Sequence, residues 1–325
     1  MLDPQANGLL KLMLEYGVPP VNTQTPQEAR DAYVSRKGFS QPDPLPVNSV
    51  SDHLLDLGSH QLKIREYRPH APRSLLQSAG GAQRMPALIY YHGGGWTIGN
   101  IETHDVLCRA LCHGAGCAVY SVDYRLGPED PFPAAFDDAL AAYHWLLEKA
   151  HDPSYGIDPH RIALGGDSAG GNLAAAACIA LKVNAIAPCF QLLIYPATDM
   201  LCAHASHVKR GKGYLLTKQA IEWFRGNYMP DPQTYTDWRA SPLLASNHDG
   251  LAPAMVLLAG FDPLHDEGLA YANKLTQSGV PVQVLNFERQ IHGFITMGRI
   301  LDEANTAVDL CASVLSRAFQ LKDQL

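Results

Sequence analysis

The segment GDSAG at positions 166–170 has the residue types of a nucleophilic site. It follows an apolar run at 162–165 and precedes an alanine-rich stretch, so the pattern G-x-S-x-G falls where a strand turns into a helix. Such a turn exposes the serine hydroxyl at the helix N-terminus, where developing negative charge is favoured. We therefore predict Ser168 as a nucleophile. The alternative is an ordinary helix start with a polar cap and small residues, because short motifs also occur by chance.

The segment HGGGW at 92–96 directly follows another apolar run, at 87–91. Three successive glycines let backbone N–H groups turn toward one point, and a serine nucleophile requires such donors for the negative oxygen of its tetrahedral intermediate. A loop that needs glycine only for flexibility is the alternative. The position after a buried strand, together with a second glycine-rich turn, favours an oxyanion hole.

Asp262 and His292 are candidates for the acid and the base that a serine nucleophile needs. Asp262 follows the apolar run at 254–259, and His292 follows the run at 282–287. Both residues are thus predicted at the carboxyl ends of strands, where open α/β sheets bind ligands. The chain order serine, aspartate, histidine is also the order found in the hydrolase architecture that carries this serine motif.

The acid role has competing candidates. Asp262 precedes Pro263 and would also make a good helix N-cap, which could be its only role. Asp266 and Glu267 lie close by, but they fall in the first turn of the predicted helix, where acidic side chains suit the helix dipole without catalysis. We therefore favour Asp262.

The elements that position these residues alternate along the chain. Short apolar runs without strict alternation are typical of buried parallel strands, and the segments between them have helical patterns. This alternation predicts an α/β fold with helices on both faces of a sheet. The predicted strands are 62–68, 87–91, 118–122, 162–165, 191–195, 254–259 and 282–287, and the predicted helices are 9–16, 25–37, 101–114, 133–151, 169–183, 265–278 and 301–321.

Two segments interrupt this pattern. Residues 38–50 contain three prolines in QPDPLPV, which predicts a linker between an N-terminal helical piece and the main body. Residues 198–240 are rich in aromatic residues and methionine and are interpreted as a helical insertion. A short low-complexity loop is predicted at 74–83.

Composition limits the protein class and its partners. With 325 residues, 46% hydrophobic and 18% charged, the chain is predicted to fold as one large domain or a domain with an insert. The net charge of −7 and the absence of a basic cluster argue against nucleic acid and anionic membranes as partners. No apolar run reaches the roughly 20 residues of a membrane span, and the start of the chain does not resemble a signal peptide.

Cysteine and histidine spacing gives no sign of a metal site. The seven cysteines lack CxxC spacing and lie mostly in apolar surroundings, so we expect buried reduced thiols and a cytoplasmic location. His204 and His207 are spaced as two ligands on one helical face could be, but no acidic or cysteine cluster accompanies them. We predict surface positions for both and no metal.

Together these residues resemble the hormone-sensitive-lipase-like branch of the α/β-hydrolase esterases, also called bacterial family IV. The order and approximate spacing of the motifs agree over residues 60–320. The motifs are HGGGW at 92–96, VDYRLGPE at 122–129, GDSAGG at 166–171, DPLHDEG at 262–268 and HGF at 292–294.

The resemblance implies a role for each motif residue. Ser168 would be the nucleophile, His292 the general base and acid, and Asp262 its partner. The backbone N–H groups of three residues would form the oxyanion hole, and two further residues would support its loop. The oxyanion-hole residues are Gly94, Gly95 and Ala169, and the supporting residues are His92 and Gly93.

The resemblance also implies an architecture. The α/β-hydrolase fold has a mostly parallel central sheet of about eight strands with helices on both faces and a helical cap. Residues 1–48 and 199–238 would form the cap over a catalytic core of 49–198 and 239–325. No cofactor or metal is implied, and a homodimer is compatible with the family.

These residues predict a serine carboxylesterase that hydrolyses short- to medium-chain esters of small molecules through an acyl-enzyme intermediate. Trp96, beside the oxyanion glycines, is a candidate wall of the substrate pocket, as are Leu215 and Phe294. Two alternatives stay open. One is an amidase or formamidase that uses the same triad, and the other is a non-catalytic ligand-binding relative on the same fold.

Overall fold

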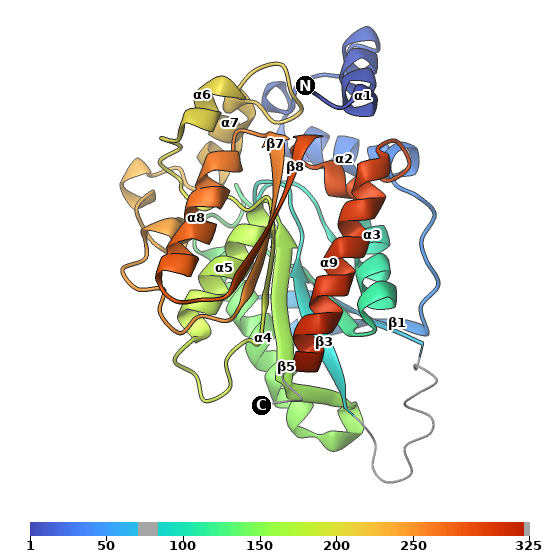
Figure 1. The fold of residues 1–325 in the computed structure, drawn as a ribbon, viewed down its shortest axis with the longest axis vertical. Helices are drawn as coiled ribbons and strands as arrows, with labels where there is room; N and C mark the ends of the chain where they lie inside the picture. The colour runs from blue at the N-terminus through green and yellow to red at the C-terminus, as the bar shows by residue number, and fades with distance from the viewer. Residues whose placement is uncertain (71–83, 322–325) are drawn as a thin grey trace.

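The computed structural model describes residues 1–70 and 84–321, so the loop predicted at 74–83 lies outside the described residues. The described strands form a single sheet in the order β1-β2-β4-β3-β5-β6-β7-β8 (Figure 1). β2 runs antiparallel to β1 and β4, and the other adjacent pairs are parallel. The strands are β1 (Ser49–Asp56), β2 (Gln61–Arg68), β3 (Met85–Tyr91), β4 (Ala118–Asp123), β5 (Ile157–Asp167), β6 (Gln191–Ile194), β7 (Ala254–Phe261) and β8 (Val282–Ile291).

Helices cover both faces of this sheet, as the continuous apolar strands require. On one face, α3 packs against α9, and on the other face lie α4, α5 and α8 (Figure 1). Two hydrophobic cores result, one on each side of the strands. The helices are α3 (Ile101–Ala115), α4 (Ala134–His151), α5 (Ala169–Leu181), α8 (His265–Gln277) and α9 (Asp302–Leu321).

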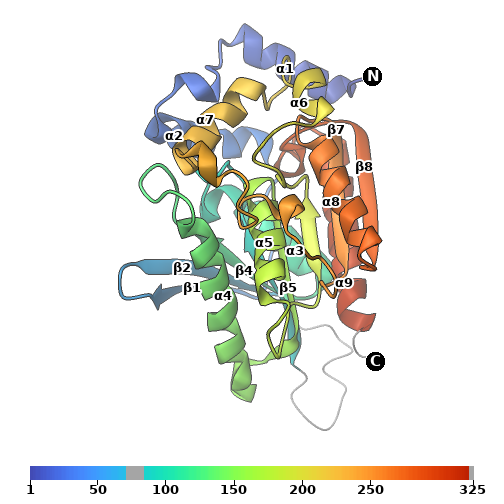
Figure 2. The ribbon, with the colours of Figure 1, turned by 90° about the vertical axis from the view of Figure 1, so that its left-hand side faces the viewer.

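Four further helices gather over one end of the sheet (Figure 2). They come from the two segments that were expected to form a cap. α2 begins after a capping box, in which Thr25 and Glu28 each satisfy the backbone N–H of the other, with Pro26 at the first position. The helices are α1 (Pro4–Glu15), α2 (Pro26–Ser40), α6 (Ala205–Lys209) and α7 (Lys218–Tyr228).

The structure differs from the sequence prediction at the N-terminal side of the core. The segment at 38–50 was interpreted as a linker, but its last residues, from Ser49, begin the edge strand β1. α1 begins earlier than predicted because Asp3 accepts hydrogen bonds from the first free N–H groups of the helix. All seven predicted strands are confirmed. Among the described residues no helix is long and apolar enough to cross a membrane.

Candidate active site

Ser168 lies at the sharp turn between β5 and α5. Its φ of 56° and ψ of −116° fall in a region that residues with a Cβ rarely adopt, so the turn is strained. Close packing around the turn keeps this strained conformation in place. Gly170 lies so close to β3 that a Cβ on it would collide with the carbonyl oxygen of Tyr91. The turn places the serine side chain on the wall of a pocket, one residue before the first helical N–H, that of Ala169.

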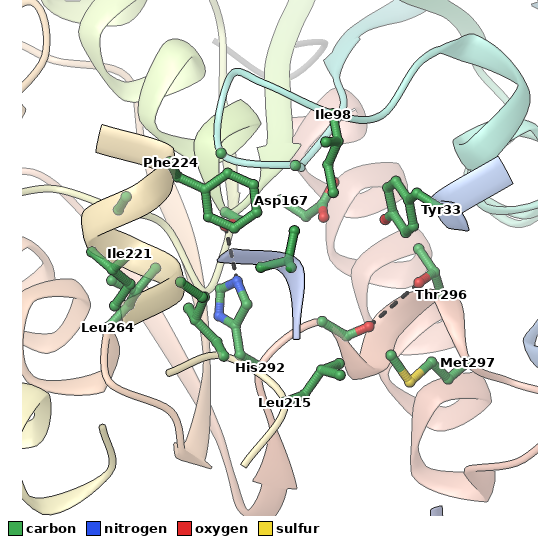
Figure 3. Close-up of a pocket in the computed structure, with 18 of the residues that line it drawn as sticks. Tyr33, Ile98, Asp167, Leu215, Ile221, Phe224, Leu264, His292, Thr296 and Met297 are labelled. Carbon is green, nitrogen blue, oxygen red and sulfur yellow. Dashed lines mark hydrogen bonds between the residues drawn. The ribbon is translucent and has the colours of Figure 1, made fainter. Parts of the chain in front are cut away.

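His292 lies between the serine and an acid. Its Nε2 is 2.9 Å from Ser168 Oγ, a contact drawn as the dashed line at His292 in Figure 3. Its Nδ1 is 2.6 Å from Asp262 Oδ2. A carboxylate can only accept, so Nδ1 carries the proton and Nε2 is left to accept from the serine hydroxyl. The second oxygen of Asp262 accepts from the N–H of Leu264 at 2.8 Å, which fixes the orientation of the carboxylate. This arrangement can transfer a proton from serine to histidine.

The competing acids face other partners. Asp266 accepts from the N–H of Ser206 at 2.9 Å. Glu267 is fully buried and contacts His207 Nε2 at 2.6 Å. The surface position predicted for His207 is therefore wrong: it is buried beside an acid that is distant in the sequence, whereas His204 is half-buried. In the described part of the chain, no three His, Cys, Asp or Glu side chains cluster as a metal site.

The loop after β3 contains two glycines in the left-handed region of backbone space. Gly94 has a φ of 123° and Gly95 a φ of 57°, and a Cβ on Gly94 would collide with the carbonyl of Ile98. Both glycines line the pocket that contains Ser168. Ala169 is the first residue of α5, so its N–H has no carbonyl partner within the helix. The structure thus brings the three predicted oxyanion-hole residues to the serine.

The pocket has a volume of about 300 Å³. Trp96 lines it and stacks on Tyr228 with ring centroids 4.7 Å apart, and Leu215 lines it as well. Phe294 does not belong to this wall, contrary to prediction: it is fully buried and its ring packs 6.1 Å from that of Tyr195. The residue follows His292 by two positions, but the chain turns there and sends the ring into the core.

Helices over the end of the sheet form two opposite walls of the pocket (Figure 3). Ile221 and Phe224 come from α7 and lie on the same side as Leu264. Tyr33 of α2 and Thr296 lie on the other side. The catalytic histidine candidate lies between these walls, so a bound molecule would contact both α2 and α7.

A comparison with known families agrees with this geometry. Residues 88–296 match the family described by the α/β-hydrolase fold. The chain belongs to this family.

Relatives of this α/β hydrolase include named ester hydrolases. The carboxylic ester hydrolase LipN of Mycobacterium tuberculosis is 40% identical over 302 residues, which cover 91% of this chain and 77% of LipN. The ethyl acetate hydrolase of Pseudomonas putida is 40% identical over 301 residues, which cover 90% and 92% of the two chains. The resemblance to the hormone-sensitive-lipase-like branch is confirmed.

A solved structure has the same fold over nearly the whole chain. The ester hydrolase EH1AB1 from the metagenome of Lake Arreo, in complex with a bipyridine phosphonate derivative, superposes with a TM-score of 0.91 at 42% identity. The match covers 98% of this chain and 100% of that one. The predicted α/β-hydrolase fold is therefore confirmed.

In this α/β hydrolase, Asp167 connects the serine turn to the glycine loop, a role that the motif alone did not indicate. Its Oδ1 accepts from the N–H of Gly93 at 2.9 Å and from the hydroxyl of Tyr90 at 2.8 Å. Burial raises the pKa of Asp167, but nearby His104, 3.2 Å away, and the Tyr90 hydroxyl outweigh that effect, so its pKa is lowered. The carboxylate is therefore ionised and holds the loop.

His92 supports the same loop as a neutral side chain. Burial lowers the pKa of His92 to about 3, and the neighbouring His104 lowers it as well. The ring stacks on Tyr124 with centroids 4.2 Å apart, and its Nδ1 is 2.8 Å from the carbonyl oxygen of Gly93. Because that oxygen can only accept, Nδ1 carries the single proton of the ring.

Proposed function

We propose that this α/β hydrolase is a serine carboxylesterase that hydrolyses short- to medium-chain esters of small molecules. The observation that carries the proposal is the chain of hydrogen bonds from Ser168 through His292 to Asp262, at 2.9 and 2.6 Å. The names of its relatives, among them an ethyl acetate hydrolase, support the same substrate class.

In the first half-reaction, His292 Nε2 takes the hydroxyl proton while Ser168 Oγ attacks the ester carbonyl. Asp262 holds the tautomer of the histidine and stabilises the imidazolium that forms. The backbone N–H groups of Gly94, Gly95 and Ala169 are proposed to bind the oxyanion, and loss of one such donor typically costs about 10²- to 10³-fold in rate.

The intermediate then collapses. His292 donates its proton to the leaving alkoxide, and the acyl group stays on Ser168 as an ester. A water molecule, deprotonated by the same Nε2, attacks this acyl-enzyme in the second half-reaction. The acid is released and the serine hydroxyl is restored.

The chain-length preference follows from the size of the pocket. A cavity of about 300 Å³ is at the small end for ligand sites. We assign residues 1–48 and 199–238 to a cap and residues 49–198 and 239–325 to the catalytic core, because helices of the cap segments supply two pocket walls. A homodimer and a cytoplasmic location stay predictions from the sequence.

The test compares the wild-type protein with Ser168→Ala on nitrophenyl acetate, butyrate, octanoate and palmitate. We expect kcat/KM to fall by about 10⁴-fold or more on the esters that the wild type cleaves. The exposed Ser313→Ala serves as the matched control and should keep wild-type rates.

Three outcomes would contradict parts of the proposal. A wild type no faster than Ser168→Ala on every ester would rule out the esterase. Faster turnover of palmitate than of butyrate would rule out the chain-length preference. Faster cleavage of a nitroanilide than of the matching nitrophenyl ester would indicate an amidase instead.

A further inference from the structure

One face of α2 forms a wall of the pocket. Tyr33, Arg36, Lys37 and Ser40 all line the cavity, and their spacing of three, four and seven residues places them on a single stripe of the helix. A helix that lies over an apolar cavity normally presents an apolar stripe. This stripe instead carries two cations.

Neither cation is neutralised within the part of the chain that the structure describes. Among those residues, no carboxylate lies within ion-pair distance of Arg36 or Lys37. Arg36 Nε donates to the carbonyl oxygen of Ala32 at 3.2 Å, and its guanidinium lies over the ring of Tyr33 at 5.3 Å. By contrast, Arg30 on the same helix pairs with a glutamate at 2.6 Å.

The carboxylates that line the pocket already have their own partners. Asp167 accepts from two donors beneath the glycine loop. Glu267 contacts His207, and Asp199 accepts from the N–H of Leu201 at 2.9 Å. The positive charge on the α2 wall is therefore available to a bound molecule.

The opposite wall presents apolar side chains. Arg225 of α7 also lines the pocket, but its guanidinium donates to the carbonyl oxygen of Met200 at 2.7 Å and lies over the ring of Tyr235. Ile221 and Phe224 of α7 lie with Leu264 across the pocket from Tyr33 (Figure 3). A substrate that fits both walls has one apolar arm toward α7 and one negatively charged arm toward α2. The ester group between the arms would then lie near the histidine.

From these contacts we infer that Arg36 and Lys37 bind a carboxylate on one arm of the substrate, so that the site prefers esters that carry a free carboxylate. This inference rests on the proposed esterase function. A guanidinium binds a carboxylate with two parallel hydrogen bonds, and an ammonium adds a point charge. The reaction is unchanged: the acyl C–O bond breaks, a water oxygen joins the acyl carbon, and the leaving alkoxide takes a proton.

The test uses two pairs of esters that differ in charge. Monoethyl adipate carries the carboxylate on the acyl arm and is compared with ethyl hexanoate. 5-Acetoxypentanoate carries it on the alcohol arm and is compared with pentyl acetate. The readout is the ratio of kcat/KM for the charged ester to that for its neutral partner, measured by acid release at low ionic strength.

For at least one pair, we expect Arg36→Gln and Lys37→Gln each to lower this ratio by about two- to fivefold, the range for a partly solvated ion pair. Arg36→Glu should lower the ratio further, and Arg36→Lys should keep most of it. Lys11→Gln on the exposed side of α1 is the matched control and should leave the ratio unchanged.

The inference is overturned if neither pair of esters changes its ratio in Arg36→Gln, Lys37→Gln or Arg36→Glu. Should Arg36→Gln fail to fold, Lys37→Gln still tests whether positive charge on the α2 wall binds the carboxylate. A wild type that cleaves none of the four esters faster than Ser168→Ala would instead remove the proposed function. The two failures are thus distinguishable.

Discussion

The carboxylate of Asp262 uses its two oxygens for different partners. Oδ2 contacts His292 at 2.6 Å, while Oδ1 accepts from the N–H of Leu264 just before α8. Asp266, four residues later, contacts Ser206 and His265 and not His292. The two aspartates are therefore a matched pair for testing which acid serves the base.

We expect Asp262→Asn to lower kcat by about 10³- to 10⁴-fold, because an amide can donate to Nδ1 and so favour the wrong tautomer of His292. Asp266→Asn should change kcat by only a few-fold. Steady-state kinetics on nitrophenyl butyrate check this, with circular dichroism as a folding control. Equal losses in both variants would contradict the assignment.

At the residue scale, local motifs predicted positions whose side chains lie together in the structure. Ser168 and His292 were predictable because each lies in a short motif at the end of an apolar run. Phe294 and His207 were not, since their surroundings are set by residues distant in the sequence, such as Tyr195 and Glu267. Spacing carries no information about such contacts.

At the element scale, a strand could be predicted from the sequence where its side chains are buried in the structure. The central strands are buried on both faces, so their apolar runs predicted them. β1 is an edge strand with mostly exposed side chains, and its sequence SVSDHLLD lacks such a run. Of the helices that form pocket walls, α2 was predicted as an element, whereas α7 was predicted only as part of a helical insertion at 198–240. Which side of each helix faces the pocket could not be predicted, because it depends on how α2 and α7 lie over the sheet.

The position of α7 sets the width of the pocket. A Cβ on Gly95 would collide with the ring of Phe224, so this ring lies directly against the glycine loop after β3. We expect Phe224→Ala to enlarge the pocket beside this loop. The ratio of kcat/KM for nitrophenyl octanoate to that for nitrophenyl butyrate should rise by roughly three- to tenfold.

The nitrophenyl ester series measures this ratio. Glu222→Ala, two residues earlier on the same helix and exposed, is the control and should leave the chain-length profile unchanged. A profile that is also unchanged in Phe224→Ala would show that α7 does not limit the chain length.

At the scale of the whole molecule, the two cores enclose most of the cysteines. Cys108, Cys178 and Cys311 are no more than 2% exposed. Burial raises the pKa of Cys112, Cys202 and Cys311 to about 12, and raises that of Cys108, Cys117 and Cys178 as well. At these six positions thiols rather than reactive thiolates are therefore present at pH 8.

We predict that native protein at pH 8 reacts with a disulfide reagent such as DTNB at less than about one thiol per chain within minutes. In denaturant all seven cysteines should react. Ser313→Cys on the exposed side of α9 is the control and should add one rapidly reacting thiol. Fast reaction of several thiols in the native wild type would show that the cores open readily.

The two pocket walls have a consequence for evolution. Residues of α2 and α7 line the pocket, whereas the serine, the acid and the histidine lie on turns at strand ends beneath these helices. Mutations on the inner faces of these helices can therefore accumulate without altering the proposed catalytic residues. Related enzymes can therefore diverge in the substrates that they accept. A mutant library confined to these helix faces should contain many active variants with new substrate preferences.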